Sequence, residues 1–430
     1  MSTLAFSLTF ILMIVLMLLG LPIAVAMVLV GAGAGVLVFG VPFLSSTGAM
    51  LWGVLNDNLL TAAPLFILLG ELLLRSGMAD RMYGAMSAWL SRLPGGLLHT
   101  NIACCALFAA TSGSSVATAA TIGTVALPSL HQRKYPMPQA LGTLAAGGTL
   151  GILIPPSINM IVYGSLTENS IGKLFIAGVI PGLLLTGFFM LFVLINSSIK
   201  RNVPREALPP LQERLRLMIH LVPPIVIFGI VMGSLYTGVA TATESAALGV
   251  VVALFFAWKA GRLSWPMLET CFLQTARTTG MIMLILAAAF VLNLLISLSG
   301  VAETMTKAVT SLGLSATAML LVLIVFYLLL GMFMDVMSML VATVPITYPI
   351  VTALGVDPIW FGIFIILMCE LALITPPVGM NLFVVQGVRP DRGGIGDVIR
   401  GALPYVVIMM AFTLLLMVFP VIVTWLPGKM

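Results

Sequence analysis

Long apolar runs separated by short polar segments make up most of this chain. A helix needs about 20 mostly apolar residues to cross the ~30 Å hydrocarbon core of a bilayer. The pattern therefore predicts an all-α polytopic membrane protein. Its ten expected spans are residues 4–19, 21–40, 53–74, 139–164, 174–197, 219–235, 238–258, 277–297, 360–388 and 403–425.

Two further apolar runs, 101–129 and 317–349, carry small or polar residues at their centres. These centres are Thr111 to Ser115 and Gly331 to Asp335. We interpret each run as a re-entrant helical hairpin, which enters the membrane and returns to the same side. One kinked span for each run is the alternative, but it would flip every later loop and scatter the positive charges between the two sides.

Double prolines interrupt two of the expected spans, at Pro155-Pro156 and Pro376-Pro377. Two prolines remove two backbone donors and clash with the preceding turn, so each helix must unwind there. Unwound backbone at membrane depth is tolerated only where protein buries it or where it lines a cavity. Paired interruptions in corresponding halves of a transporter indicate its binding site.

The two breaks belong to an internal repeat with an offset of 221 residues, which also aligns Ser114 with Asp335 and Pro128 with Pro349. Each half contains five transmembrane helices and one hairpin, and an odd number of crossings inverts the second half. The predicted parts are a first inverted repeat at 1–199 (hairpin 101–129, broken helix 139–164), a cytoplasmic linker at 200–218 and a second inverted repeat at 219–430 (hairpin 317–349, broken helix 360–388).

The charges give this topology an orientation. Placing the N-terminus outside puts all nineteen Lys and Arg residues on the cytoplasmic side except Lys173, Lys307 and Lys429, as expected for short loops. A chain that is 60% hydrophobic and 8% charged is too apolar for a soluble domain, and its dispersed basic residues exclude a nucleic-acid-binding face. The first apolar run is not expected to be a cleaved leader, because no basic residue precedes it.

Two short segments, 78–92 and 301–312, mix apolar and polar residues at helical spacing. This spacing predicts amphipathic arms that lie at the membrane interface. The linker between the halves contains prolines and several charges, so we expect it to be a solvated connector.

The hairpin tips and the helix breaks are the candidate sites for an ion. Hydroxyls at Thr111 to Ser115, together with the free carbonyls of Gly151 to Pro156, suit a small hard cation such as Na+. The symmetric site would combine Gly331 to Asp335 with Thr375 to Gly379. Small residues also serve close helix packing, which is the alternative for each cluster. Asp335 is a further functional candidate, because ionisable groups in apolar segments are costly.

Asn159 and Asn381 follow the two breaks and either contact polar groups of a substrate or cap the restarted helices. The sequence has no Walker loop, no zinc-protease motif and no serine nucleophile elbow. We therefore expect neither direct ATP coupling nor an enzyme. The four cysteines lack metal or disulfide spacing and are expected to be small core residues.

With these motifs the chain resembles the large membrane subunit of tripartite ATP-independent periplasmic (TRAP) transporters, the DctM-like family of the ion-transporter superfamily. The motifs that support this resemblance are Ala110-Thr-Ser-Gly-Ser-Ser115, Gly151-Ile-Leu-Ile-Pro-Pro-Ser157, Gly331-Met-Phe-Met-Asp335 and Leu373-Ile-Thr-Pro-Pro-Val-Gly379. One departure is Thr241-Ala242-Thr243-Glu244, where the family commonly has Thr-Pro-Thr-Glu.

The resemblance implies a sodium-driven elevator in the bacterial inner membrane, with a transport domain that slides against a scaffold domain and a periplasmic N-terminus. It also implies two partners, a small four-helix membrane subunit and a periplasmic binding protein that delivers an organic acid such as a sialic acid, a C4-dicarboxylate or another sugar acid. The implied first sodium site is Ser112, Gly113, Ser114, Ser115, Gly151, Ile154 and Pro156, and the second is Gly331, Met334, Asp335, Thr375 and Val378. The expected substrate contacts are Ser157, Asn159, Gly379 and Asn381. The rival functions are a self-sufficient sodium- or proton-coupled carboxylate symporter and, less favoured, a channel.

Overall fold

The computed structural model describes residues 3–56, 60–200, 203–204, 209–300, 303–304, 306–307, 313–391 and 393–430, and these residues form helices and connecting segments without any strand. The first half contains α1 (Thr3–Leu18), α2 (Ile23–Phe39), α3 (Pro42–Leu55), α4 (Ala62–Arg75), α5 (Met78–Leu90), α6 (Leu97–Ser112), α7 (Ser115–Gln132), α8 (Met137–Leu153), α9 (Ile158–Thr167) and α10 (Ile171–Lys200). The second half contains α11 (Leu211–Leu217), η1 (Met218–Leu221), α12 (Val222–Tyr236), α13 (Ala242–Lys259), α14 (Trp265–Ser299), α16 (Ala316–Gly331), α17 (Val336–Ala353), α18 (Pro358–Ile374), α19 (Met380–Gly387), α20 (Ile395–Val418), α21 (Val421–Thr424) and η2 (Pro427–Lys429). The expected all-α fold is confirmed.

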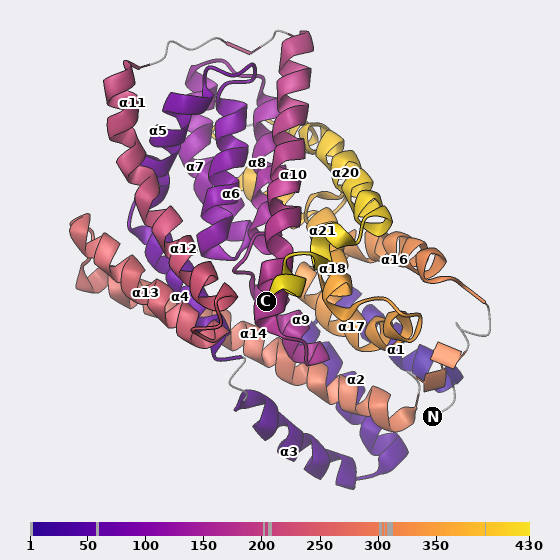
Figure 1. Ribbon diagram of the computed structural model, residues 1–430. Helices are drawn as coiled ribbons and strands as arrows, with labels where there is room; N and C mark the ends of the chain where they lie inside the picture. Colours follow the sequence, from indigo (N-terminus) through magenta and orange to yellow (C-terminus); the bar gives the residue numbers. More distant parts are fainter. Residues whose placement is uncertain are drawn as a thin grey trace.

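Two helices form the centre of the molecule. Every residue of α8 from Ala140 to Leu153 and every residue of α18 from Trp360 to Ile374 is buried. Helices that are apolar on all sides are stable only where other helices surround them. α8 packs against α6, α7, α18 and α20, whereas α14 packs outside this group against α2, α3, α4 and α17. In Figure 1 the purple helices α6, α8 and α10 run side by side, and α14 crosses below them at an oblique angle.

Hydrogen bonds tie together the segments of each expected hairpin. At the base of the first, the backbone N–H of Leu97 donates to Tyr135 Oη (3.1 Å), and near its tip the hydroxyls of Ser112 and Thr118 are 2.9 Å apart. In the second, Tyr327 Oη of α16 lies 2.8 Å from Thr343 Oγ1 of α17. Hydroxyl pairs of this kind hold two apolar helices in one register, because an unpaired hydroxyl in an apolar environment is unfavourable.

The number of membrane spans differs from the ten expected. Seven described helices, or eight with the bent pair α4–α5 counted as one span, are long and apolar enough to cross a bilayer. The single span expected at 53–74 is wrong, because α3 ends at Leu55 and α4 begins at Ala62. The helix at 360–388, which the double proline predicts to be broken, is divided into α18 and the short α19. Polar or proline-containing segments end these helices inside runs that are apolar on average.

The two expected arms have different outcomes. α5 bends 68° away from α4 and buries one face, including Met82 and Tyr83, as an amphipathic arm should. Most of the second arm, 301–312, lies outside the described residues.

The linker contains α11, whose residues are exposed or half-buried and which contacts α5, and its role as a solvated connector stays a prediction. There the Arg214 guanidinium sits 5.2 Å from the centre of the Trp89 ring, a cation–π contact that ties the two helices. Residues 201–202 and 205–208 of the linker lie outside the described part.

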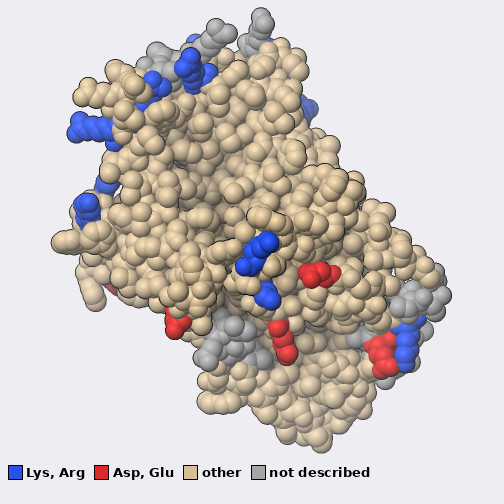
Figure 2. Space-filling view, viewed as in Figure 1, with Lys and Arg blue, Asp and Glu red and all other residues tan. Residues whose placement is uncertain are grey.

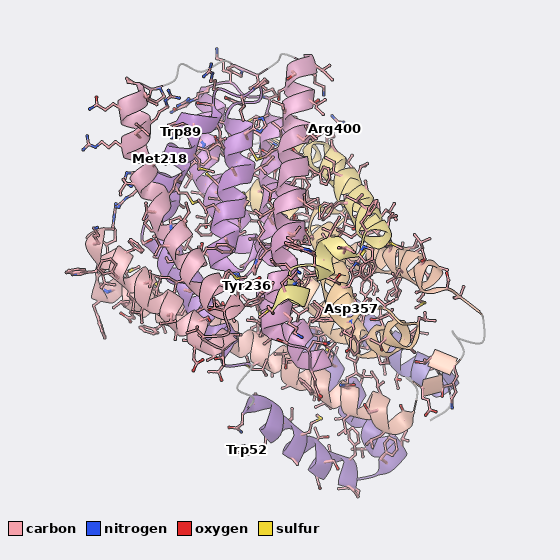
Figure 3. The ribbon with its side chains drawn as sticks, viewed as in Figure 1. Trp52, Trp89, Met218, Tyr236, Asp357 and Arg400 are labelled. Atoms are coloured by element: carbon pink, nitrogen blue, oxygen red, sulfur yellow. The ribbon has the colours of Figure 1, made fainter. Side chains whose placement is uncertain are left out.

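Basic side chains gather at one end of the molecule. Figure 2 shows most of the visible Lys and Arg residues at the upper end, near α5, α10 and α11. Trp89 and Arg400 lie toward this end in Figure 3, whereas Trp52, 74% exposed, lies at the opposite end. Exposed tryptophans at two ends are typical of membrane interfaces, and a basic end is typical of a cytoplasmic face. The periplasmic position of the N-terminus stays a prediction.

Candidate binding site between the two hairpins

The candidate site lies beside two breaks, one at the end of each central helix. α8 ends at Leu153 and α9 begins at Ile158, while α18 ends at Ile374 and α19 begins at Met380. The Pro155-Pro156 and Pro376-Pro377 bonds within these breaks are both cis. Proline has no N–H to donate, so carbonyls of the preceding turn are left without a helical partner and can face a ligand.

The tip of the first hairpin touches the first break through two glycines. A Cβ on Gly113, where φ is +62°, would lie 2.7 Å from the carbonyl oxygen of Pro156. A Cβ on Gly151 would lie 2.6 Å from the carbonyl oxygen of Ser114. Only glycine allows this approach, which brings backbone oxygens from two chain segments together.

The structure therefore assembles most of the expected first ion site. Ser112 lies at the end of α6, and Ser114 caps α7 by accepting the Ala117 N–H. Ser115 opens α7 and lies beside the first break. The side chain of Ile154 faces away, toward Gly182 of α10.

The expected second ion site is held by more local contacts. A Cβ on Gly331 would lie 2.5 Å from the Cβ of Ala372, so α16 packs directly on α18. Asp335 caps α17: its Oδ2 accepts the backbone N–H of Met337 and Ser338 (both 3.1 Å), and its Oδ1 accepts the Ser338 hydroxyl. Thr375 donates to the Leu371 carbonyl (2.6 Å).

None of these hydrogen bonds joins Asp335, at the hairpin tip, to the second break, where Thr375 lies. Met334 lies at the hairpin tip and Val378 in the break. The expected ligands of the second site are therefore engaged within their own elements, and this ion site stays a prediction.

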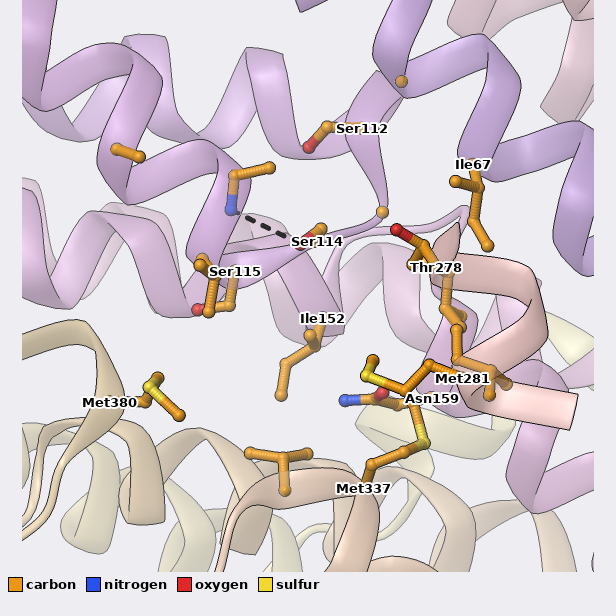
Figure 4. A pocket seen from close by; sticks show the side chains of 18 of the residues that line it. Ile67, Ser112, Ser114, Ser115, Ile152, Asn159, Thr278, Met281, Met337 and Met380 are labelled. Carbon is orange, nitrogen blue, oxygen red and sulfur yellow. Dashed lines mark hydrogen bonds between the residues drawn. The ribbon is translucent and has the colours of Figure 1, made fainter. Parts of the chain in front are cut away.

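A cavity of about 450 Å³ lies between the two hairpin tips. Its walls come from both hairpins, the helix ends that flank both breaks, α4 and α14. Figure 4 shows Ser114 and Ser115 on one side of this space, Met337 and Met380 on the other, and Asn159 beside Met281. The lining residues include Ile67, Gly70, Glu71 and Leu74 of α4, Gln274, Thr278, Met281 and Ile282 of α14, and Ser112 to Ala117 of the first hairpin with Asp335 to Met337 of the second.

The two halves contribute equivalent positions to this cavity. Five lining residues of the first half have a lining counterpart 221 residues later: Ser114 with Asp335, Ser115 with Val336, Val116 with Met337, Ile152 with Leu373, and Asn159 with Met380. The offset is the one that the double prolines give. Pairing of this kind is what an internal repeat with a site between its halves predicts.

Helix ends supply positive potential to the cavity. Among the described lining residues none is Lys, Arg or His. The helices α7, α9, α17 and α19 all begin at or beside lining residues, and a helix N-terminus carries a partial positive charge with free N–H groups. The cavity can therefore attract an anion without a basic side chain.

The four expected substrate contacts lie in different places. Asn159 lines the cavity, is 5% exposed and makes no side-chain hydrogen bond within the described protein. Asn381 is fully buried behind the cavity, where its Nδ2 donates to Ser115 Oγ (2.7 Å) and the Ala145 carbonyl (3.2 Å). Ser157 caps α9, and Gly379 begins α19 with φ +34°.

Sequence reasoning missed the α14 wall. Gln274, Thr278 and Met281 recur at helical spacing and line the cavity, but the expected span began only at residue 277. The sequence did carry a signal: Gln274, Thr278 and Met281 stand at i, i+4 and i+7, a spacing that places them on one face of a helix. Glu71 of α4 also lines the cavity and pairs with Arg75 across 3.2 Å.

Comparisons with known proteins find related sequences and a similar fold. Residues 10–422 match the family model described as tripartite ATP-independent periplasmic transporter, DctM component. The C4-dicarboxylate TRAP transporter large permease protein DctM of Pseudomonas aeruginosa is 36% identical over 91% of this chain and 92% of its own length. The sialic acid TRAP transporter large permease protein SiaM of Vibrio cholerae is 30% identical over 88% of each chain. The solved structure of the Alcanivorax borkumensis YdaH transporter has a similar fold, with a TM-score of 0.61 at 16% identity over 94% of this chain and 98% of that one.

Proposed function

The chain belongs to the DctM family of TRAP transporters, and is thus a membrane permease for organic acids and not an enzyme; from this premise we propose that it imports its substrate by a sodium-driven elevator mechanism. Its proposed place is the bacterial inner membrane, with the N-terminus in the periplasm. Its proposed partners are the small four-helix membrane subunit and a periplasmic binding protein that delivers the acid.

The cavity between the two hairpin tips is the observation that carries this proposal. A transporter needs a site near the middle of its fold that two gates can close in turn. The paired lining positions from the two halves, Ser114 with Asp335 and Asn159 with Met380, support an inverted repeat with one site at its axis. The same pairs support the proposal that each hairpin gates one side.

Sodium coupling is supported by the contact between the first hairpin and the first break. A small cation bound by carbonyls of Ser114 and Pro156 would join these two segments, because the glycine contacts already bring them together. The tip would then be ordered only with the ion bound, and an ordered tip would shape the substrate cavity. Such linkage gives ion and substrate a common preferred state.

The packing supports a division into moving and fixed parts. α8 lies against α20 so closely that a Cβ on Gly401 would overlap the Pro138 carbonyl, and α8 also holds both helices of the first hairpin. The hairpins with α8, α9, α18 and α19 are the proposed transport domain. The helices α2, α3, α4 and α14, which pack together, belong to the proposed scaffold.

The test is uptake of labelled organic acids into proteoliposomes that contain this chain with its small subunit and binding protein. We expect uptake to require all three proteins and an inward sodium gradient. Uptake by this chain alone would favour a self-sufficient carboxylate symporter, and a flux that does not saturate would favour a channel.

Variants in the two hairpin tips make the assay specific. Ser114→Ala and Asp335→Ala should each reduce sodium-dependent uptake. Ser264→Ala is the matched control, because Ser264 likewise caps a helix, α14, by accepting a backbone N–H (3.4 Å), but does not line the cavity. Normal uptake by both tip variants would count against the assignment of the ion sites.

A further inference from the structure

The two ends of the cavity differ in polarity at three of their five paired positions, although the repeat makes these positions equivalent. In the first half the three are Ser114 and Ser115 of the hairpin and Asn159 of α9. Their counterparts in the second half are Asp335 and Val336 of the hairpin and Met380 of α19, whereas the other two pairs, Val116 with Met337 and Ile152 with Leu373, are apolar at both ends. A site that binds two identical groups would place similar side chains at equivalent positions, so this site is built for a ligand with two different ends.

The first end is suited to one carboxylate. The Asn159 side chain is buried, borders the cavity and has no hydrogen-bond partner in the described protein. A buried amide without a partner is unfavourable and indicates a missing ligand group. Its NH₂ group donates, as do the Ser114 and Ser115 hydroxyls, and α7 begins there with a neutral serine cap. These donors and the helix N-terminus all favour a carboxylate.

The second end is unsuited to another carboxylate. The N-terminus of α17 is already occupied by the Asp335 carboxylate, which accepts two backbone N–H groups. A second substrate carboxylate would find this helix end occupied and would meet the apolar side chains of Val336, Met337, Leu373 and Met380. Burial of an unpaired charge against apolar groups is costly. Glu71, on the α4 wall, is itself a carboxylate and is paired with Arg75.

We propose that the substrate is an organic acid with one carboxylate, held at the first hairpin, and an apolar body that lies against the methionines of the second hairpin and α14. This inference rests on the proposed transport function and narrows it. Met281, Met337 and Met380 come from three different elements and are flexible enough to fit a branched or aromatic body. A compact dicarboxylate is the substrate class that this arrangement disfavours.

The first test compares two 2-oxo acids that differ at the end far from the shared group. The protein is this chain with its small subunit, purified in detergent with sodium, and binding is measured by calorimetry without the binding protein. We expect 4-methyl-2-oxopentanoate to bind at least about tenfold more tightly than 2-oxoglutarate, since one end of the latter would be charged in an apolar place. Equal or tighter binding of 2-oxoglutarate, or binding of neither acid, would overturn the proposal.

Two variants separate the ends of the ligand. Met337→Ala should weaken the binding of 4-methyl-2-oxopentanoate about tenfold through lost apolar contact. It should leave the binding of pyruvate, which lacks the apolar body, unchanged. Asn159→Leu should weaken the binding of both acids. Met218→Ala is the control, because Met218 lies in η1 outside the cavity and is 43% exposed. An equal loss of pyruvate and 4-methyl-2-oxopentanoate in Met337→Ala would contradict the assigned orientation.

These outcomes are distinct from failure of the proposed transport function. Sodium-driven uptake through the complete three-protein system reports on that function alone. Tight dicarboxylate binding together with normal sodium-driven uptake would overturn the proposed substrate class and leave the proposed transport function standing.

Discussion

Replacing Gly151 by alanine should disturb the ion site more than the fold. The new Cβ would lie 2.6 Å from the carbonyl oxygen of Ser114 and 2.8 Å from the backbone nitrogen of Ser115, whereas ordinary contact begins at 3.4 Å. Both neighbours are backbone atoms at the hairpin tip, so the tip itself must move. The displaced carbonyl is one that we propose to bind sodium.

The size of the effect follows from two opposing terms. Overpacking of a close contact costs about 1–3 kcal/mol. Gly151 lies within α8, and alanine favours a helix over glycine by up to about 1 kcal/mol, so this term offsets part of the loss of folding stability. The net loss of folding stability should therefore be about 0–3 kcal/mol, small enough for the variant to fold. The sodium affinity should fall more, because ion ligands tolerate little displacement.

The matched control is Gly187→Ala, since Gly187 lies within α10 and has no atom within 4 Å of the added Cβ. Thermal unfolding and the sodium concentration for half-maximal uptake are measured for both variants. Gly151→Ala should require several-fold more sodium, and Gly187→Ala should match the parent protein. An unchanged sodium requirement in a folded Gly151→Ala variant would refute the link between this contact and the ion.

Three further changes test other parts of the structure. Asn381→Ala removes the hydrogen bond to Ser115 that ties the second broken helix to the first hairpin, so thermal unfolding should show a loss of about 1–3 kcal/mol; an unchanged melting temperature would contradict this role. Glu370→Gln should keep or raise the melting temperature, because both carboxyl oxygens are buried without a partner in the described protein and a neutral amide is less costly to bury there than a charge; a clear fall would reveal a partner. A hydrogen bond from Arg389 lowers the pKa of Asp391, so this ion pair stabilises the loop fully above the ordinary carboxyl pKa and is lost as the pH falls through the lowered value; Asp391→Asn should flatten the loss of melting temperature in acid, and an unaltered acid profile would exclude the pair as its cause.

The features that could be predicted from the sequence are those fixed by local chemistry. Pro155-Pro156 and Pro376-Pro377 follow the ends of α8 and α18 where expected, because two consecutive prolines remove two backbone donors and clash with the preceding turn. The serine and glycine residues at the first hairpin tip and Asp335 at the second also lie where expected, since they end one helix and cap the next.

Other features depend on packing that the sequence does not display. α14 begins at Trp265, twelve residues before the expected span, because its polar first turns resemble a loop when they are considered alone. The late start of the expected span left out Gln274, whereas Thr278, Met281 and Ile282 lay within it and were not identified as lining residues. The break between α3 and α4 was missed because averaging over 53–74 hides a short polar interruption.

Asn381 shows how finely a site depends on register. The repeat counterpart of Asn159 is Met380, and Asn381 is one residue further along α19. One residue turns a helical side chain by about 100°, enough to move it from the cavity to the buried face. Similarity between the two asparagines suggested equal roles, whereas their positions in the repeat do not.

The length of α14 has a consequence for the surrounding lipid. Its 35 residues give a rod of about 52 Å, well above the ~30 Å of hydrocarbon, and Figure 1 shows it oblique to α6 and α10. A thinner bilayer favours a greater tilt of such a rod, and a thicker one a smaller tilt. Because Gln274 and Thr278 travel with it, membrane thickness acts directly on one wall of the cavity. The lipid composition of the host membrane is thus one of the variables that set the shape of the binding site.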